Sequence, residues 1–342
     1  MKKPLNYLKH AFVRMYIGFT CGVLAVFTTS ISPAMASETV PVKLRLDWTT
    51  LGYHAPFYYG VAQGIYEQEG IKLTIEEGKG SASVAQLAAS GNDDFGFSDA
   101  TTVAQLVAKG LPGKVVMGIL RGTTLAMFFP SDRGIKAPAD LQGRKISVCP
   151  GDAISVYIEP YLKSLGLTGT ELSKLSVDCT LKYTVVAQGR ADLVMSYGTA
   201  GKPLLQKVGI SEPATIPPGP GFYLPGHGIV ASNKLINERP DVIRRFVAAT
   251  AKAWDAAAKD PDGAVKAVTD ARPLLKSDQA ALKDTLLISL NYLDAPSSSG
   301  HPFGWQSPQD WETALDLLDQ YADMASSIEP SDVMTNDFIQ GK

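Results

Sequence analysis

The chain has 342 residues, of which 45% are hydrophobic and 19% are charged, and its formal net charge at pH 7 is −2. Basic and acidic residues are nearly balanced, at 32 Lys and Arg against 34 Asp and Glu. This balance, without a block of basic charge, excludes the electrostatic pattern of a nucleic-acid-binding protein. A chain of this length can bury the cores of two domains.

The first 36 residues have the pattern of a secretory signal peptide. Basic residues precede an apolar run from about residue 15 to residue 31, and Ala34-Met35-Ala36 gives the small-x-small spacing that signal peptidase accepts. We predict cleavage after Ala36 and a periplasmic product. Residues 1–36 hold four basic and no acidic residues, so their removal would leave a formal charge of −6. The alternative is an uncleaved anchor helix, but polar residues dilute the run below a good span of about 20 apolar residues.

The mature sequence begins with a strand that leads into an aromatic loop. Leu44 and Leu46 alternate with polar residues, which is the period of a strand. A proline in the first turn of the next segment then begins a helix. Trp48, Tyr53 and His54 are therefore expected in the loop at the carboxyl end of a strand, where open α/β sheets bind small molecules. The alternative is that the two aromatics are core side chains and His54 is a capping or surface group.

A glycine-rich turn after the next strand, residues 71–76, opens a second helix. Ser81, Ala82 and Ser83 stand at its start, where free backbone N–H groups and the positive dipole end suit a carboxylate, a sulfonate or a ring oxygen. Helix capping by Ser81 alone explains the same pattern. The glycine spacing does not match a nucleotide-binding loop.

A third strand, residues 94–98, ends with Ser98, and Asp99 begins the next helix. Both residues are candidates for ligand binding, although Asp99 also fits a plain N-cap. Strand, helix and strand alternate three times with short connections in this half of the chain. That alternation is typical of a parallel sheet covered by helices.

A second strand-helix series repeats the first in kind. Residues 144–149 form a strand, and the turn that follows carries Asp152 and Ser155 at a helix start. The series continues to Tyr197, at the end of another apolar strand. The two helix starts could face one another across a cleft, which makes Asp152, Ser155 and Tyr197 further candidates for ligand binding.

The remaining chain is proline-rich over residues 213–226, then forms a strand over 228–232, and is otherwise helical. Trp305 precedes its last long helix and lies over the cleft or packs beneath that helix. We predict an α/β fold of two lobes, each a doubly wound sheet, joined by two crossing segments. Lobe 1 comprises residues 37–127 and 227–342, and lobe 2 comprises residues 128–226.

Two cysteines remain after signal cleavage, and each ends an apolar strand-like run. In an oxidising compartment a Cys149–Cys179 disulfide is plausible, and two buried free thiols are the alternative. With two cysteines and three histidines scattered over the mature chain, no metal site is expected.

Several segments resemble the periplasmic substrate-binding proteins of ATP-driven (ABC) importers, in the branch for taurine, nitrate, sulfonates and thiamine-pyrimidine precursors. The segments are LRLDWTTLGYHAPFYYGVAQGIYEQEGI, GKGSASVAQLAASGNDDFGFSDATTV, ADLQGRKISV, WETALDLLDQYADM and VMTNDFI. The pair Asp47-Trp48, with His54 seven residues after Asp47, is most similar to the pyrimidine-precursor subgroup. The resemblance covers essentially the whole mature chain.

This resemblance implies a type II periplasmic binding protein fold, ligand capture between the lobes by hinge closure, and delivery to a membrane permease with its ATPase subunits. The same subgroup includes fungal enzymes that build the thiamine pyrimidine by consuming one of their own histidines, and His54 falls at the matching position. Those enzymes carry a cysteine-rich iron-binding motif that this chain lacks. A secretory signal also does not suit a cytosolic enzyme. We therefore expect a monomeric binding protein without catalytic residues, metal or cofactor.

The favoured ligand is a thiamine pyrimidine precursor or a related heteroaromatic or aromatic compound. Trp48 and Tyr53 would stack on it, while His54 and the helix starts would hydrogen-bond its polar edge. An anion of the sulfonate, taurine or nitrate type is the alternative, because helix starts can bind an anion without a buried arginine. The rival from another class is a thiamine-pyrimidine synthase-like enzyme that uses His54. A hydrolase is not supported, since no G-x-S-x-G motif and no triad partner for a histidine is evident.

Overall fold

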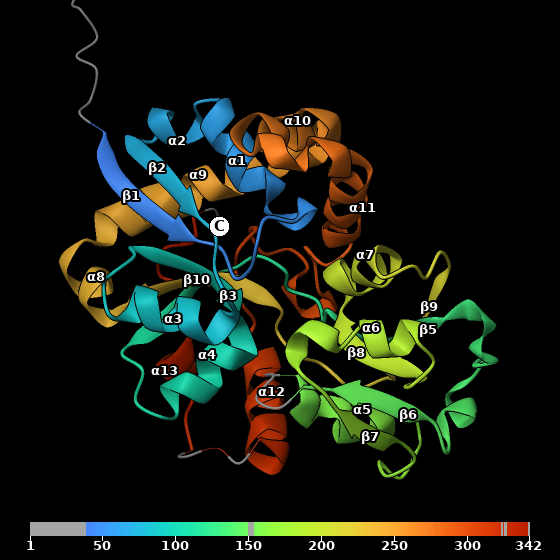
Figure 1. The fold of residues 1–342 in the computed structure, drawn as a ribbon. Helices are drawn as coiled ribbons and strands as arrows, with labels where there is room; N and C mark the ends of the chain where they lie inside the picture. Colours follow the sequence, from blue (N-terminus) through green and yellow to red (C-terminus); the bar gives the residue numbers. More distant parts are fainter. Residues whose placement is uncertain (1–38, 150–153, 323, 325–326, 341–342) are drawn as a thin grey trace, which may run out of the picture. The chain divides into compact units, whose positions relative to one another are not determined.

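Two five-stranded sheets form the framework of the protein (Figure 1). The structure is a computed structural model, and it describes residues 39–149, 154–322, 324 and 327–340. The predicted signal peptide, residues 1–36, and the candidate residue Asp152 lie outside the described residues.

The first sheet has the strand order β2-β1-β3-β10-β4. β1 pairs in parallel with β2 and β3, whereas β10 lies antiparallel between β3 and β4. Its strands are β1 (Val40–Arg45), β2 (Ile71–Glu76), β3 (Phe95–Asp99), β4 (Gly113–Gly118) and β10 (His227–Ser232).

The second sheet has the order β7-β6-β8-β5-β9. β6 pairs in parallel with β7 and β8, whereas β5 runs antiparallel to β8 and β9. Its strands are β5 (Leu125–Pro130), β6 (Lys145–Val148), β7 (Ser173–Ser176), β8 (Leu193–Tyr197) and β9 (Pro213–Ile216).

Both sheets combine parallel and antiparallel pairs, and the predicted α/β architecture of two sheets is confirmed. β5 and β10 are the strands that enter each sheet directly from the other one. A strand that arrives without a crossover helix is free to pair antiparallel. All six residues of β5 belong to the second sheet. The lobe boundary after residue 127 stays a prediction, and a boundary before Leu125 would keep β5 whole.

Helices cover both faces of the first sheet (Figure 1). One face packs against α1, α9, α10 and α11 in a single apolar core, and the other packs against α3, α4 and α13. The helices of this part are α1 (Ala55–Ala62), α2 (Ile65–Gln68), α3 (Ser81–Ala89), α4 (Ala100–Val107), α8 (Asn233–Glu238), α9 (Pro240–Lys259), α10 (Pro261–Ala271), α11 (Gln279–Leu290) and α13 (Pro330–Val333).

The second sheet is covered by α5 (Ile158–Ser164) on one face and by α6 (Thr184–Ala187) and α7 (Gly198–Lys207) on the other. α12 (Pro308–Tyr321) contacts both α4 and α5. Its Trp311 is almost fully buried. α12 therefore packs against one helix from each of the two sheets.

α9 shows how the sequence pattern sets the packing. Its apolar face is buried, and Phe246 stacks on Phe95 of β3 with ring centroids 4.0 Å apart. The residues of that face are Ile243, Phe246, Val247, Thr250 and Trp254.

Within the residues that the structure describes, no helix combines the length and apolarity that crossing a bilayer requires.

The predicted disulfide between Cys149 and Cys179 is confirmed. Cys149 follows β6 and Cys179 follows β7, and these neighbouring parallel strands bring the two residues to the same edge of the sheet. The pair closes a loop with a sequence separation of 30. In the chain-entropy model such a loop adds about 3 to 4 kcal/mol of stability.

Candidate functional site

Asp47 lies just beyond the carboxyl end of β1, and its surroundings hold it in a buried position. The residue is only 6% exposed. Its backbone carbonyl accepts a 2.8 Å hydrogen bond from the Gly80 N–H, which ties the loop after β1 to the turn before α3. Small molecules bind at the carboxyl ends of strands in α/β sheets. A buried carboxylate here is therefore a candidate ligand-binding group.

Two side chains from the predicted aromatic loop donate hydrogen bonds to this carboxylate. His54 Nε2 lies 2.7 Å from Asp47 Oδ1, and the Tyr53 hydroxyl lies 3.0 Å from Oδ2 and 3.3 Å from Oδ1. Both side chains belong to η1 (Gly52–His54), a 3-10 turn that leads into α1. The structure thus brings two of the predicted site residues together around Asp47.

The hydrogen bonds of His54 fix its tautomer. The Leu51 N–H donates to Nδ1 at 3.0 Å. Nδ1 therefore carries no proton, and the proton on Nε2 is donated to Asp47. His54 is 0% exposed, so a direct contact with a ligand stays a prediction, whereas its contact with Asp47 is observed.

A second histidine, His227, approaches the other oxygen of Asp47. It is the buried first residue of β10, and its Nε2 lies 3.3 Å from Asp47 Oδ2. The pairing of β10 with β3 places it opposite Asp99. Burial lowers the pKa of His227, but the Asp47 carboxylate, with a smaller contribution from Asp99, raises it above the usual value of 6.5.

The protonation states of this cluster follow from burial and pairing. Burial alone would raise the pKa of Asp47, yet the neighbouring His227 and the hydrogen bond from His54 lower it well below the usual 3.8. Burial and the charge of Asp47 raise the pKa of Tyr53 well above 10. Near neutral pH, Asp47 is therefore an anion and Tyr53 a hydrogen-bond donor. We call Asp47, Tyr53, His54 and His227 the Asp47 cluster.

Aromatic rings from both sheets surround the Asp47 cluster. Phe97 of β3 lies 5.3 Å from the His227 ring, and Tyr197 at the end of β8 meets that ring edge-on at 4.9 Å, measured between centroids. Burial, reinforced by the charge of Asp99, raises the pKa of both Tyr157 and Tyr197 above 10. The carboxyl edges of the two sheets therefore meet where polar groups are enclosed by aromatic rings.

Asp99 caps α4, as the alternative interpretation of this residue expected. Its Oδ1 accepts hydrogen bonds from the backbone N–H of Thr102 at 2.7 Å and from the hydroxyls of Thr101 and Thr102 at 2.7 and 2.8 Å. A contact between its other oxygen and a ligand stays a prediction.

The predicted serines join the start of α3 to the end of β3. Ser81 Oγ accepts from the Asp99 N–H at 3.1 Å, and Ser98 Oγ donates to the Ser81 carbonyl at 3.0 Å. Ser83 Oγ donates to the carbonyl of the residue three positions earlier at 2.8 Å. Ala82 lies exposed between them. The hydroxyls of Ser83 and Ser98 donate within the protein, so an anion site here would rest on the backbone N–H groups and the Ser81 hydroxyl.

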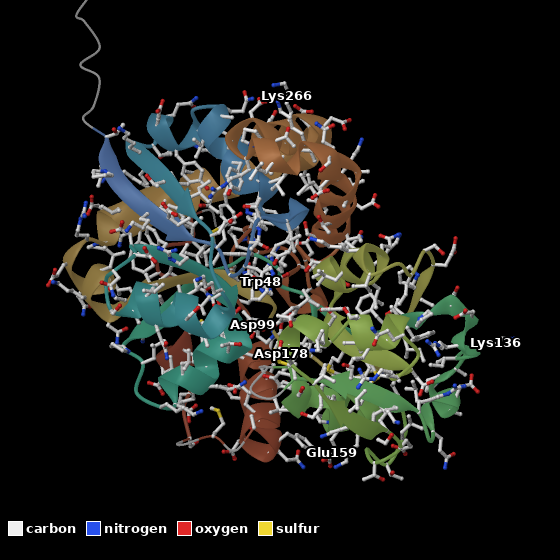
Figure 2. The ribbon with its side chains drawn as sticks, viewed as in Figure 1. Trp48, Asp99, Lys136, Glu159, Asp178 and Lys266 are labelled. Atoms are coloured by element: carbon white, nitrogen blue, oxygen red, sulfur yellow. A yellow bond between two sulfur atoms is a disulfide. The ribbon has the colours of Figure 1, made fainter. Side chains whose placement is uncertain are left out.

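Trp48 has a different environment from its neighbours. It is 47% exposed, so the alternative that it is a core side chain is wrong. Figure 2 labels Trp48 and Asp99, which come from the loop after β1 and from the end of the neighbouring strand β3. The exposed indole is therefore on the same strand edge as the Asp47 cluster and remains a candidate for stacking on a ligand.

Replacing Trp48 by alanine tests this role. Because the indole is half exposed, we expect the thermal midpoint of the ligand-free protein to stay nearly unchanged, while ligand binding weakens by more than about 1 kcal/mol. Scanning calorimetry and titration calorimetry measure the two quantities. A loss of several kcal/mol of stability with normal binding would contradict the stacking role.

The remaining candidates lie at other positions. Ser155 opens a short 3-10 turn before α5. Trp305 stacks on the exposed His301 with ring centroids 3.6 Å apart, and it lines a pocket that His227 also lines. That pocket measures about 20 Å³, which holds about one water molecule. A ligand with an aromatic ring does not fit in this pocket.

Asp47 and His227 are site residues that no local sequence pattern marks. A buried-strand histidine is visible in the sequence as the polar first residue of an apolar strand, residues 227–232. Only the sheet order, which inserts β10 beside β3, brings that histidine to Asp47.

Comparison with known proteins gives the context of this site. A family model described as NMT1/THI5 like matches residues 52–264. The formylaminopyrimidine-binding protein of Halalkalibacterium halodurans is 26% identical over 305 residues, which cover 86% of this chain and 88% of that protein. The riboflavin-binding protein RibY of Chloroflexus aurantiacus is 21% identical over 327 residues, which cover 92% of this chain and 93% of RibY.

An enzyme and a sulfonate-binding protein are also similar. The 4-amino-5-hydroxymethyl-2-methylpyrimidine phosphate synthase of Aspergillus parasiticus is 22% identical over 261 residues, covering 70% of this chain and 72% of the enzyme. The solved structure of the alkanesulfonate-binding protein SsuA from Xanthomonas axonopodis pv. citri, bound to MOPS, is 16% identical. It aligns with a TM-score of 0.65 over 88% of this chain and 99% of that one.

These findings confirm the predicted resemblance and the predicted fold. The likeness to SsuA shows that the two mixed sheets form a periplasmic binding protein fold. The family match begins at Gly52, the first residue of η1, and extends beyond β10. It therefore includes Tyr53, His54 and His227. The chain belongs to the NMT1/THI5-like family.

Proposed function

We propose that this protein is the solute-binding component of an ABC importer and that it captures a heteroaromatic compound, with a thiamine pyrimidine precursor favoured. The observation that carries the proposal is the Asp47 cluster: a buried carboxylate, two histidines and a tyrosine hydroxyl between the edges of two sheets, enclosed by aromatic rings. Aromatic faces with a few convergent polar groups suit a small planar ligand. Two relatives whose names state heteroaromatic ligands, formylaminopyrimidine and riboflavin, support this class.

A sulfonate-type anion is the second candidate ligand, because SsuA has the same fold and is named for alkanesulfonates. The charges near the Asp47 cluster argue against it. Asp47 is held ionised, and Asp99 lies close enough to raise the pKa of His227. A negative ligand placed here would be repelled by both carboxylates.

An enzyme that consumes His54 is not favoured. Leu51 N–H and Asp47 occupy the two ring nitrogens of His54, and the ring is fully buried. Within the described part of the chain, no group of three His, Cys, Asp or Glu side chains is arranged to hold a metal ion. We propose that the protein binds its ligand without turnover.

The family comparison and the leader-like sequence support a periplasmic setting for this function. We propose a periplasmic monomer, released by cleavage after Ala36, that delivers its ligand to a membrane permease and its ATPase subunits. The Tyr197 ring of the second sheet meets the buried His227 ring of the first, so the ligand would enter when the sheets separate and be enclosed when they close. This is the hinge motion that binding proteins of this kind use.

A thermal-shift screen tests the proposed function. The panel contains formylaminopyrimidine, 4-amino-5-hydroxymethyl-2-methylpyrimidine, riboflavin, taurine and an alkanesulfonate. A ligand at 100 times its dissociation constant stabilises the fold by about 2.7 kcal/mol. We expect a pyrimidine to raise the midpoint and the two sulfonates to leave it unchanged. Stabilisation by taurine or the alkanesulfonate alone would move the proposal to the anion class, and release of a modified product would make the protein an enzyme.

A further inference from the structure

His227 is a buried histidine whose Nδ1 has no hydrogen-bond partner within the part of the chain that the structure describes. The residue is 1% exposed. Among the described residues, no group makes an aligned hydrogen bond to its Nδ1 or to its Nε2, although Nε2 lies 3.3 Å from Asp47 Oδ2. A buried polar atom without a partner costs free energy, about 1 to 3 kcal/mol. Such an atom in a binding protein is a natural contact for a ligand.

The fold holds His227 firmly in this position. Its backbone carbonyl accepts hydrogen bonds of 2.9 Å from the N–H groups of Ile119 and Leu120. Its ring packs on Phe97 from the same sheet and meets Tyr197 from the other sheet. Separation of the sheets would remove Tyr197 from this ring and open the way to it.

We propose that His227 is a ligand-binding residue, in which Asp47 holds Nε2 and Nδ1 donates a hydrogen bond to an acceptor atom of the bound heteroaromatic compound, a ring nitrogen or a carbonyl oxygen. This inference rests on the proposed function and assigns the polar contact within it. His54 cannot make the same contact, because both of its ring nitrogens are already bonded. Of the two histidines at Asp47, only His227 has a nitrogen left for a ligand.

The protonation state of His227 decides whether this contact forms. Imidazolium donates from both nitrogens, whereas neutral imidazole that donates Nε2–H to Asp47 leaves Nδ1 as an acceptor. The ligand's acceptor atom therefore binds the protonated form. The charged and titratable groups around His227 are Asp47, Tyr53, His54, Asp99 and Tyr197, and Arg121, Tyr223 and Asp310 across the adjoining pocket.

The sign of the pH dependence follows. Because the Asp47 carboxylate raises the pKa of His227 above 6.5, the donor form is present at pH 6 and is lost as the pH rises through the raised value. Ligand affinity should therefore fall on the alkaline side. Binding at a pH above the raised pKa should also take up a proton, since His227 must become charged to make the contact.

The substitution His227→Phe tests the contact while keeping a ring against Phe97 and Tyr197. The probe is 4-amino-5-hydroxymethyl-2-methylpyrimidine, titrated by calorimetry at pH 6 and pH 8. We expect about a tenfold or larger loss of affinity at pH 6, as for loss of a charged hydrogen bond. The variant should also lose the pH dependence of the wild type. His227→Gln keeps a donor that does not titrate, so it should bind more tightly than His227→Phe and equally at both pH values.

The control is His301→Phe, at an exposed histidine outside the Asp47 cluster, which should keep wild-type affinity and pH dependence. Proton uptake by the wild type, measured in two buffers of different ionisation enthalpy at a pH where the wild-type affinity has fallen, covers the case in which a variant does not fold. If His227→Phe binds with the affinity and the pH dependence of the wild type, or if the wild type takes up no proton, the inference is wrong while the proposed function stands. If the wild type binds none of the pyrimidine and flavin probes, the proposed function fails and the inference with it.

Discussion

Replacing Asp47 by alanine is expected to destabilise the protein by about 3 to 5 kcal/mol, the usual cost of removing one partner from a buried ionic network. The substitution would leave His54 Nε2–H and the Tyr53 hydroxyl without their shared acceptor, and His227 without its carboxylate. Ligand binding should be lost as well, because the same carboxylate orients the polar groups of the site. Urea unfolding measures the stability change and titration calorimetry the loss of binding.

The variant Asp47→Asn adds a prediction about how the loss of stability depends on pH. The depressed pKa of Asp47 contributes stability that is present above 3.8 and is lost as the pH falls further. The raised pKa of His227 contributes stability that is fully present below 6.5 and is lost as the pH rises through the raised value. The difference in the free energy of unfolding between the wild type and Asp47→Asn should therefore be largest between pH 3.8 and pH 6.5.

Asp93→Asn is the matched control for this pH profile. Asp93 is also buried, and it pairs with Arg45 Nε at 2.5 Å. Arginine stays charged throughout the alkaline range, so the cost of this substitution should not shrink as the pH rises through the raised pKa of His227. If the stability losses of the two variants change with rising pH in the same way, the assigned pairing of Asp47 with His227 is contradicted.

Gly198→Ala is expected to weaken ligand binding by about 5- to 150-fold, which corresponds to the 1 to 3 kcal/mol cost of overpacking. Gly198 begins α7 beside the second sheet, and a Cβ there would lie 2.1 Å from the hydroxyl oxygen of Tyr292, which follows α11 beside the first sheet. The added methyl group would hold these segments apart and so oppose closure. Titration calorimetry measures the affinity, and solution scattering measures the radius of gyration.

Two further variants separate closure from general damage. In the double variant Gly198→Ala with Tyr292→Ala, the obstructing ring is removed, so affinity should recover. Gly201→Ala lies on the same helix, but its Cβ would meet the Phe128 ring at 2.5 Å within the second sheet. It should lower stability more than affinity. Unchanged binding by Gly198→Ala would show that the arrangement of α7 and α11 is not required to hold the ligand.

Local patterns in the sequence were enough to predict most elements of this fold. The alternation around Leu44 and the helical spacing on α9 arise because one face of each element is buried. Such a period is visible in a short stretch of sequence. The direction of β5 and β10 could not be predicted in this way. It depends on the chain passing from one sheet to the other, and no local period encodes that path.

The site was predictable only in part for the same reason. Tyr53 and His54 follow a strand directly, so the pattern places them at its carboxyl end. His227 lies 180 residues after Asp47 in the numbering, and only the pairing of β10 with β3 brings the two together. The exposure of Trp48 and the capping bonds of Asp99 likewise depend on tertiary neighbours, which a single sequence does not reveal.

The crystal structure of the mature protein with 4-amino-5-hydroxymethyl-2-methylpyrimidine tests the central claim most directly. The account predicts the pyrimidine ring between the edges of the two sheets, in contact with Tyr197 or Trp48. One of its acceptor atoms should lie within hydrogen-bond distance, about 2.7 to 3.2 Å, of His227 Nδ1. A pyrimidine bound away from the Asp47 cluster, or a sulfonate at the α3 start that binds while the pyrimidine does not, would contradict the account.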